Sequence, residues 1–178
     1  FLAAYARESD DFDLFAVVDF FTSYRAAVRA KVAAIAAGEA ELDPAQRARA
    51  AESARSHFDL AREVLAPRPP GPLVLVCGAV GIGKSTAARV AQEALGGATI
   101  ASDRVRKRLA GLAPTDRMRG ADLDALYAEG VTEQVYAAVL ERAEPLLSSG
   151  RAAILDATYS RRRHREAAQR FAAERGSE

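Results

Sequence analysis

The feature that most constrains this chain is a glycine-rich loop between an apolar run and a helical pattern. Residues 78–85 read G-A-V-G-I-G-K-S and fit G-x-x-x-x-G-K-[ST]. An apolar run at 73–77 precedes the loop, and an alanine-rich helical pattern at 84–95 follows it. The motif requires this strand–loop–helix order, in which backbone N–H groups and the helix N-terminus face an anion. The segment therefore predicts a loop that binds the phosphates of a nucleoside triphosphate.

Within this loop, we expect the lysine and the serine to have different roles. Lys84 would bridge the β- and γ-phosphates, and the Ser85 hydroxyl would bind Mg²⁺. We expect ATP, with GTP left open, together with Mg²⁺. The alternative is a glycine-rich turn that binds nothing. The residues expected to contact the nucleotide are Gly78, Ala79, Val80, Gly81, Ile82, Gly83, Lys84, Ser85 and Thr86.

The length and composition of the chain limit its class. Its 178 residues give room for one ordinary domain and a smaller piece. No apolar run approaches the roughly 20 residues of a membrane helix, so we expect no membrane partner and a cytoplasmic location. The one cysteine, Cys77, falls in the predicted first strand as a core residue, which excludes a disulfide framework. The net charge of +1 leaves a nucleic-acid partner open without indicating one.

A proline-rich segment at residues 67–72, P-R-P-P-G-P, divides the chain. Neither a helix nor a central strand accommodates it, so we interpret it as a semi-rigid linker. It separates a helical segment at residues 1–66 from an α/β segment at residues 73–178. The sequence thus predicts a helical part followed by an α/β part.

The helical segment has apolar residues at helical spacing over residues 13–37. Asp43-Pro44 then offers an N-cap and a first-turn proline for a second helix, which runs to about residue 66. One apolar stripe on each helix predicts a helical hairpin. The stripe expected on the first helix comprises Leu14, Val17, Val18, Phe21, Tyr24, Val28, Val32 and Ile35.

In the α/β segment, strands and helices alternate, which predicts a parallel sheet with right-handed crossovers. The expected strands are residues 73–77, 98–101 and 152–156, and the last should lie between the other two. The expected helices are 84–95, 103–110, 122–148 (broken at Gly130 and kinked near Pro145) and 161–174. Nucleotide kinases of this architecture usually carry five strands. Three strands therefore suggest a P-loop NTPase domain that is incomplete at its C-terminus.

The second expected strand is followed by a carboxylate and a guanidinium one helical turn apart. Ser102 is a natural N-cap, Asp103 would project from the carboxyl edge of the sheet, and Arg106 shares its helix face. Asp103 could accept the proton of an acceptor hydroxyl while Arg106 holds an anionic group on that acceptor. The alternative is a capped surface helix with an ion pair between the two.

The third expected strand ends in Asp156, and such an aspartate holds Mg²⁺ in P-loop proteins. The alternative is an Asp that caps the next helix. Thr158 would lie near the γ-phosphate. The basic residues at 161–165, which include His164, could clamp phosphate, but in so arginine-rich a chain we favour a solvated helix face.

These three motifs resemble the P-loop kinases that include zeta toxins, polynucleotide 5′-kinases and small-metabolite kinases. They are most similar to the kinase module found behind aminoglycoside-phosphotransferase-like domains. The resemblance implies that Lys84 and Ser85 handle phosphate and Mg²⁺, that Asp103 is the base, and that Arg106 anchors the acceptor. The family's lid arginines and last strands would lie beyond Glu178, so we expect a fragment that could bind nucleotide without turnover.

The first 66 residues resemble the closing helices of aminoglycoside-phosphotransferase-like proteins, around the segment at residues 20–32. That resemblance implies contact with an upstream domain of that kind. A helical hairpin packed on the nucleotide domain is the alternative.

Two functions follow from these expectations. The first is an ATP-dependent phosphotransferase that acts on a small hydroxylated or phosphorylated acceptor, with Lys84, Asp103 and Arg106 as its catalytic residues. The second is a non-catalytic ATP-binding module that regulates a neighbouring phosphotransferase-like domain.

Overall fold

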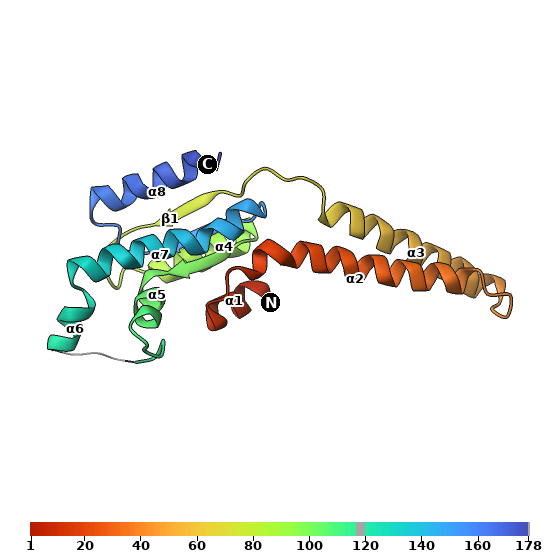
Figure 1. Cartoon of the computed structure of the whole chain (residues 1–178), viewed down its shortest axis with the longest axis horizontal. Helices are drawn as coiled ribbons and strands as arrows, with labels where there is room; N and C mark the ends of the chain where they lie inside the picture. The colour runs from red at the N-terminus through yellow and green to blue at the C-terminus, as the bar shows by residue number, and fades with distance from the viewer. Residues whose placement is uncertain (117–119, 178) are drawn as a thin grey trace. The chain divides into compact units, whose positions relative to one another are not determined.

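A computed structural model describes residues 1–116 and 120–177 (Figure 1). The chain divides into two compact units, one formed by Phe1–Leu14 with Pro69–Glu178 and the other by Phe15–Arg68. The sequence-based division assigned residues 1–66 to a single helical segment. In the structure, the first 14 residues instead belong to the unit that contains the glycine-rich loop.

The sheet of the first unit has three parallel strands, β1 (Leu73–Val76), β2 (Ala98–Ala101) and β3 (Ala153–Asp156). Their order is β1-β3-β2, which confirms the prediction that the third strand lies in the middle. Val76 and Ala101 both pair with Asp156, so all three strands end at one edge. This common edge is where an open α/β sheet binds its ligands.

Of the two outer strands, β2 has the predicted bounds, whereas β1 ends one residue earlier than predicted. Cys77 lies just beyond the end of β1 and is exposed, so its assignment as a buried strand residue is wrong. β2 begins close beside β3 because Gly97 has no side chain. A Cβ at Gly97 would lie 1.9 Å from the carbonyl oxygen of Ala152.

Helices cover both faces of the sheet. α4 (Lys84–Leu95) packs Ala88 and Ala91 against Ile154 of β3. The chain then returns from β2 to β3 through α7 (Glu129–Ser148), which contacts both strands. Two right-handed crossovers that run in opposite directions along the sheet place their helices on opposite faces. β3 is therefore buried along its whole length.

Three further helices complete the C-terminal part of this unit. α5 (Ser102–Leu109) follows β2 directly and packs on α7, and α8 (Arg162–Glu174) also contacts α7. The single helix expected at 122–148 is two helices, α6 (Ala121–Leu126) and α7. The break falls at Tyr127 and Ala128, and Gly130 lies inside α7, so the predicted break point is wrong.

The N-terminal helix α1 (Leu2–Ser9) belongs to this same unit and contacts β2. Asp10 ends α1 with a left-handed φ of 64°. Its carboxylate accepts hydrogen bonds of 2.9 and 2.5 Å from Arg142 of α7. Glu8 pairs with Arg104 of α5 at 3.1 Å. Charged contacts thus attach the start of the chain to helices more than 90 residues away.

The second unit is a hairpin of α2 (Leu14–Ala37) and α3 (Pro44–Val64), as predicted. Asp43 and Gln46 form the capping box that begins α3. The predicted apolar stripe is not the buried face, because Phe21, Tyr24, Val32 and Ile35 are each more than half exposed. Small side chains are buried instead, and the Ser23 hydroxyl donates to the Ala61 carbonyl at 2.8 Å. The buried residues are Phe15, Ser23, Ala26, Ala30, Ala54 and Ala61.

No helix in the described part of the chain combines the length and the apolar character that crossing a membrane would need.

Candidate functional site

The glycine-rich loop connects the end of β1 to the start of α4. Gly81 and Gly83 have φ angles of 86° and 91°, in the left-handed region that favours glycine. Gly83 is the N-cap residue of α4, so the loop meets the positive end of the helix dipole. The glycines therefore give the loop a shape that other residues would rarely adopt, at the place where an anion would bind.

Two polar side chains leave the first turn of α4 in different directions. The Lys84 Nζ donates a 2.7 Å hydrogen bond to the carbonyl oxygen of Ala79, within the loop. The Ser85 Oγ donates a 2.8 Å hydrogen bond to the Oδ2 of Asp156, which is 8% exposed. The strand order explains the second contact, because β3 ends next to β1 and so places Asp156 beside the start of α4.

Ser85 and Asp156 offer the oxygen ligands that Mg²⁺ prefers. Among residues 1–116 and 120–177, no group of three or more His, Cys, Asp or Glu side chains could hold a metal. Mg²⁺ in phosphate-binding sites uses one or two protein ligands and completes its shell with phosphates and waters. The pair therefore fits a magnesium ion that binds with a nucleotide, where it would neutralise phosphate charge.

α5, which follows β2, carries the predicted base Asp103 and the predicted acceptor anchor Arg106. Asp103 is exposed, whereas Arg106 is buried. Ser102 is the first residue of α5 and makes no capping hydrogen bond, so the predicted N-cap is wrong. Asp103, whose side chain is 57% exposed, pairs with Lys107 at 3.1 Å rather than with Arg106. The alternative interpretation expected an ion pair between Asp103 and Arg106. Asp103 does form a surface ion pair, but with Lys107.

Arg106 is 5% exposed and is held by α6, α7 and the break between them. Its Nη1 donates to the carbonyl of Leu126 at 2.8 Å and to the Oγ1 of Thr132 at 3.3 Å. The ring of Tyr127 lies 4.3 Å from the guanidinium carbon, which is a cation–π distance. These contacts fix a buried positive charge at the site.

One cavity of about 730 Å³ brings the predicted residues together. Lys84, Ser85, Asp103, Arg106 and Asp156 all line it. Val80 and Gly81 line it as well, whereas the lining does not include the remaining predicted nucleotide contacts. These are Gly78, Ala79, Ile82, Gly83 and Thr86.

Basic side chains outnumber acidic ones in the lining of the cavity. Four of them, Arg7, Arg89, Arg104 and Arg161, also pair with glutamates beside the lining. Among the described residues that line it, six are arginine or lysine and two are carboxylates. The cationic residues are Arg7, Lys84, Arg89, Arg104, Arg106 and Arg161. A cavity with this charge attracts anionic ligands, and its volume is in the ordinary range for small-molecule sites.

The segment that follows β3 also reaches this cavity. The exposed Thr158 lies there beside Tyr136 of α7, with 3.3 Å between the two hydroxyl oxygens. The ring of Tyr136 stacks on His164, with 3.9 Å between ring centroids. The Nε2 of His164 is 2.9 Å from the Oε1 of Glu133, and His164 is 5% exposed. The prediction that His164 belongs to a solvated helix face is therefore wrong.

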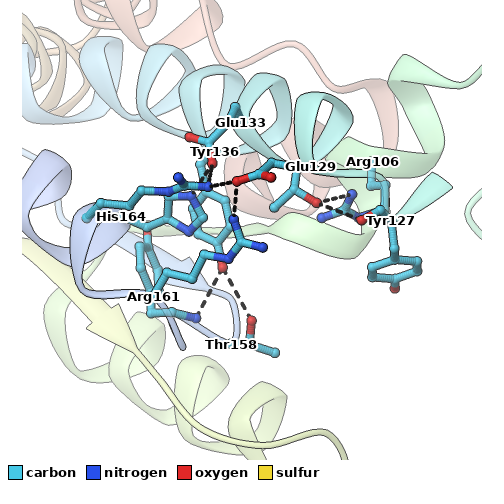
Figure 2. Close-up of polar contacts among 11 residues, drawn as sticks. Arg106, Tyr127, Glu129, Glu133, Tyr136, Thr158, Arg161 and His164 are labelled. Atoms are coloured by element: carbon cyan, nitrogen blue, oxygen red, sulfur yellow. Dashed lines mark hydrogen bonds and ion pairs between the residues drawn. The ribbon is translucent and has the colours of Figure 1, made fainter. Parts of the chain in front are cut away.

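Two arginines near His164, Arg161 and Arg163, pair with glutamates of α7. Arg161 and Arg163 each lie 2.7 Å from the Oε1 of Glu129, and Arg163 also lies 2.5 Å from Glu133 (Figure 2). Hydrogen bonds from Arg163 and Arg161 hold the pKa of Glu129 below its usual range. The hydrogen bond from His164 does the same to the pKa of Glu133. Both glutamates are thereby kept as anionic partners for this basic segment.

Sequence reasoning missed several residues that line the cavity. Tyr136, Thr132 and Tyr127 come from the α6–α7 region, where they have no recognisable motif. Arg7 comes from α1, far from the loop in the sequence. Only the path of the chain in space brings these residues together, so no local signal could have identified them.

Comparison with known proteins agrees with this fold. A family model described as an AAA domain matches residues 73–178. Uncharacterized protein Rv2004c of Mycobacterium tuberculosis and uncharacterized protein Mb2027c of Mycobacterium bovis are each 36% identical to this chain over 174 residues. The match covers 98% of this chain but 34% of each relative, so the chain spans about a third of their length. No solved structure matches the chain.

The family match begins with β1 and includes the glycine-rich loop, all three strands and the helices α4 to α8. It therefore takes in Ser85 and Asp156 as well as the helix that carries Asp103 and Arg106. On these grounds the chain belongs to the AAA domain family, and residues 73–178 are a P-loop nucleotide-binding module.

Proposed function

We propose that this protein is an ATP-dependent phosphotransferase that uses Mg²⁺ and acts on a small hydroxylated or phosphorylated acceptor. The observation that carries the proposal is the single cavity that is lined by both sets of predicted residues. Lys84, Ser85 and Asp156 form the phosphate and magnesium side. Asp103 and Arg106 form the acceptor side.

Each residue would contribute to transfer in its own way. The loop and Lys84 would bind the phosphates, while Ser85 and Asp156 would hold Mg²⁺. The acceptor oxygen would attack the γ-phosphorus and give its proton to the Asp103 carboxylate. The bond between the γ-phosphorus and the β–γ bridging oxygen would break, and ADP would leave. Such chemistry depends mainly on position and electrostatic stabilisation, and the cationic cavity favours both.

The acceptor class follows from charge and size. Arg106 is buried and fixed by Leu126 and Thr132, so it would offer a preorganised positive charge rather than a mobile one. A guanidinium binds a phosphate or carboxylate group well, because its fixed N–H donors can contact two oxygens of the anion at once. We therefore expect an acceptor that carries an anionic group beside its hydroxyl.

A second candidate is a module that binds ATP without transfer and regulates a neighbouring domain. The ion pair between Asp103 and Lys107 favours it, because a carboxylate paired on an exposed helix face can be purely structural. This candidate predicts ATP binding without phosphate transfer to any acceptor.

Phosphate transfer from γ-labelled ATP, screened over aminoglycosides, nucleosides, sugars and their phosphorylated forms, would test the proposal. Once an acceptor is found, Asp103→Asn should lower kcat by about 10²-fold or more, since it removes the general base. ATP affinity should stay nearly unchanged. Arg106→Ala should mainly raise the KM for the acceptor.

The matched control is Asp124→Asn, because Asp124 is an exposed aspartate on α6 that does not line the cavity. It should behave as wild type. If Asp103→Asn also transfers phosphate at the wild-type rate, Asp103 is not the base. If the wild-type chain binds ATP but transfers phosphate to none of these acceptors, the second candidate is supported instead.

A further inference from the structure

The hydroxyl group of Tyr136, on α7, contacts the segment that follows Asp156. The Tyr136 hydroxyl accepts a 3.1 Å hydrogen bond from the backbone N–H of Tyr159 and lies 3.3 Å from the Thr158 Oγ1 (Figure 2). Tyr136 and Tyr159 are 9% and 2% exposed, whereas Thr158 is exposed in the cavity. Tyr136 therefore connects a buried peptide group to a side chain that a ligand can reach.

The backbone at this point is held in an unusual conformation. Tyr159 has a φ of 47°, a left-handed value that is rare for a bulky side chain. The Thr158 carbonyl accepts from the N–H of Gly78, and the Tyr159 carbonyl accepts from Arg165 at 2.6 Å. Such a conformation persists only when its surroundings determine it, and it is typical of functional sites. The segment is thus fixed both to the first residue of the glycine-rich loop and to α8.

The hydrogen bonds of the Tyr136 hydroxyl have a preferred direction. A backbone N–H can only donate, so the Tyr136 hydroxyl must be the acceptor in its contact with Tyr159. The proton of Tyr136 can then be donated to Thr158 Oγ1, which leaves the proton of Thr158 available to a further acceptor. A phosphate oxygen is an acceptor only, and it favours this direction over the reverse.

The geometry points to Tyr136 as a positioning residue that orients the Thr158 hydroxyl as a donor to the γ-phosphate and so favours ATP over ADP. Thr158 lies two residues after Asp156, which bonds to Ser85 at the metal side of the same cavity. In P-loop proteins this metal bridges the β- and γ-phosphates. The inference rests on the proposed ATP site but does not depend on any acceptor.

The contacts of the Tyr136 ring allow its hydroxyl to be tested alone. The ring is packed between His164, at a centroid distance of 3.9 Å, and Tyr159, at 5.0 Å. Tyr136→Phe keeps this ring and removes only the hydroxyl. Thr158→Val keeps the shape of the threonine and removes its donor, while Thr158→Ser keeps the donor.

The experiment is calorimetry of Mg²⁺–ATP and Mg²⁺–ADP binding to the full chain. Thr158→Val should weaken ATP binding by about 10-fold, the scale of a lost hydrogen bond to a charged group, and should leave ADP binding within about two-fold. Tyr136→Phe should lower the ratio of ATP to ADP affinity in the same direction. Thr158→Ser should keep the wild-type ratio. Tyr24→Phe, an exposed tyrosine of the hairpin, is the control and should change neither affinity.

A merely structural role for Tyr136 would weaken the binding of both nucleotides alike. Equal losses for ATP and ADP in Tyr136→Phe would therefore overturn the inference, and so would an unchanged ratio in Thr158→Val. Either result would leave ATP binding by the wild-type chain intact, so the proposed function would survive. Failure of the wild-type chain to bind ATP would overturn both.

Discussion

The carboxylate of Asp156 is held at the end of the central strand, beside the start of α4. It ends the fully buried central strand, is 8% exposed, and accepts a 2.8 Å hydrogen bond from the Ser85 hydroxyl. An aspartate that orients a metal-binding hydroxyl contributes to metal affinity even when a water separates it from the ion. Its role therefore depends on the position of β3 in the sheet as much as on its own chemistry.

Replacing this carboxylate should remove most of the effect of Mg²⁺ on nucleotide binding. We expect Asp156→Asn to lower ATP affinity in the presence of Mg²⁺ by about 10- to 100-fold, because the amide no longer balances the ion's charge. With EDTA, wild type and variant should bind ATP about equally. Calorimetry with and without Mg²⁺ measures both. A variant that keeps the full wild-type Mg²⁺ effect would exclude Asp156 from the metal site.

At the scale of elements, the sequence predicted the sheet well because each strand is short, apolar and bounded by a strong signal. The loop motif located β1 to within one residue at its end, and the apolar run before Asp156 identified β3. The middle position of β3 was predicted because it brings Asp156 beside Ser85, and the observed strand order confirms it. Similarly, the motifs located Lys84, Ser85, Asp103, Arg106 and Asp156, which line one cavity in the structure.

Where prediction failed, the cause lay in contacts between distant segments. Helical spacing alone could not show that α2 buries Ala26 and Ala30 and leaves Phe21 exposed. His164 was assigned to solvent because its neighbours are arginines, yet it packs on Tyr136. Composition and periodicity describe one segment at a time. The buried face of α2 and the burial of His164 depend on side chains from another segment that pack against them.

The attachment of α1 to α7 can be tested at the same scale. Asp10 and Arg142 have side chains that are 20% and 17% exposed, and the pairing raises the pKa of the guanidinium. Asp10→Asn should lower the free energy of unfolding by about 1–3 kcal/mol, because it leaves a poorly solvated arginine without its charge partner. Urea unfolding followed by circular dichroism would measure the change.

Glu93→Gln is the control for this prediction, since it removes an equally short but exposed ion pair with Arg89 in the same unit. Exposed pairs contribute little to stability, so this variant should unfold close to wild type. Equal effects of the two substitutions would mean that the contact of Asp10 does not stabilise the unit.

At the scale of the whole molecule, the nucleotide unit is larger than the part that matches the family. The match begins at residue 73, whereas the compact unit also includes Phe1–Leu14. Arg7 of this segment lines the cavity, and Arg104 of α5 donates to the Arg7 carbonyl at 2.9 Å. The hairpin at Phe15–Arg68 is thus inserted between two parts of one unit. The site therefore includes a residue from outside the part of the chain that matches the family.

The central claim is that the whole chain binds Mg²⁺–ATP through the glycine-rich loop, and calorimetry of wild type and Lys84→Ala tests it most directly. Lys84 would supply a charged hydrogen bond to phosphate, so its loss should weaken ATP binding by roughly 10- to 100-fold. Lys31→Ala, a lysine of the hairpin, should bind ATP as wild type does. Saturable wild-type binding that falls in Lys84→Ala alone is the predicted result. Equal ATP affinity for wild type and Lys84→Ala, or no binding by either, would contradict the claim.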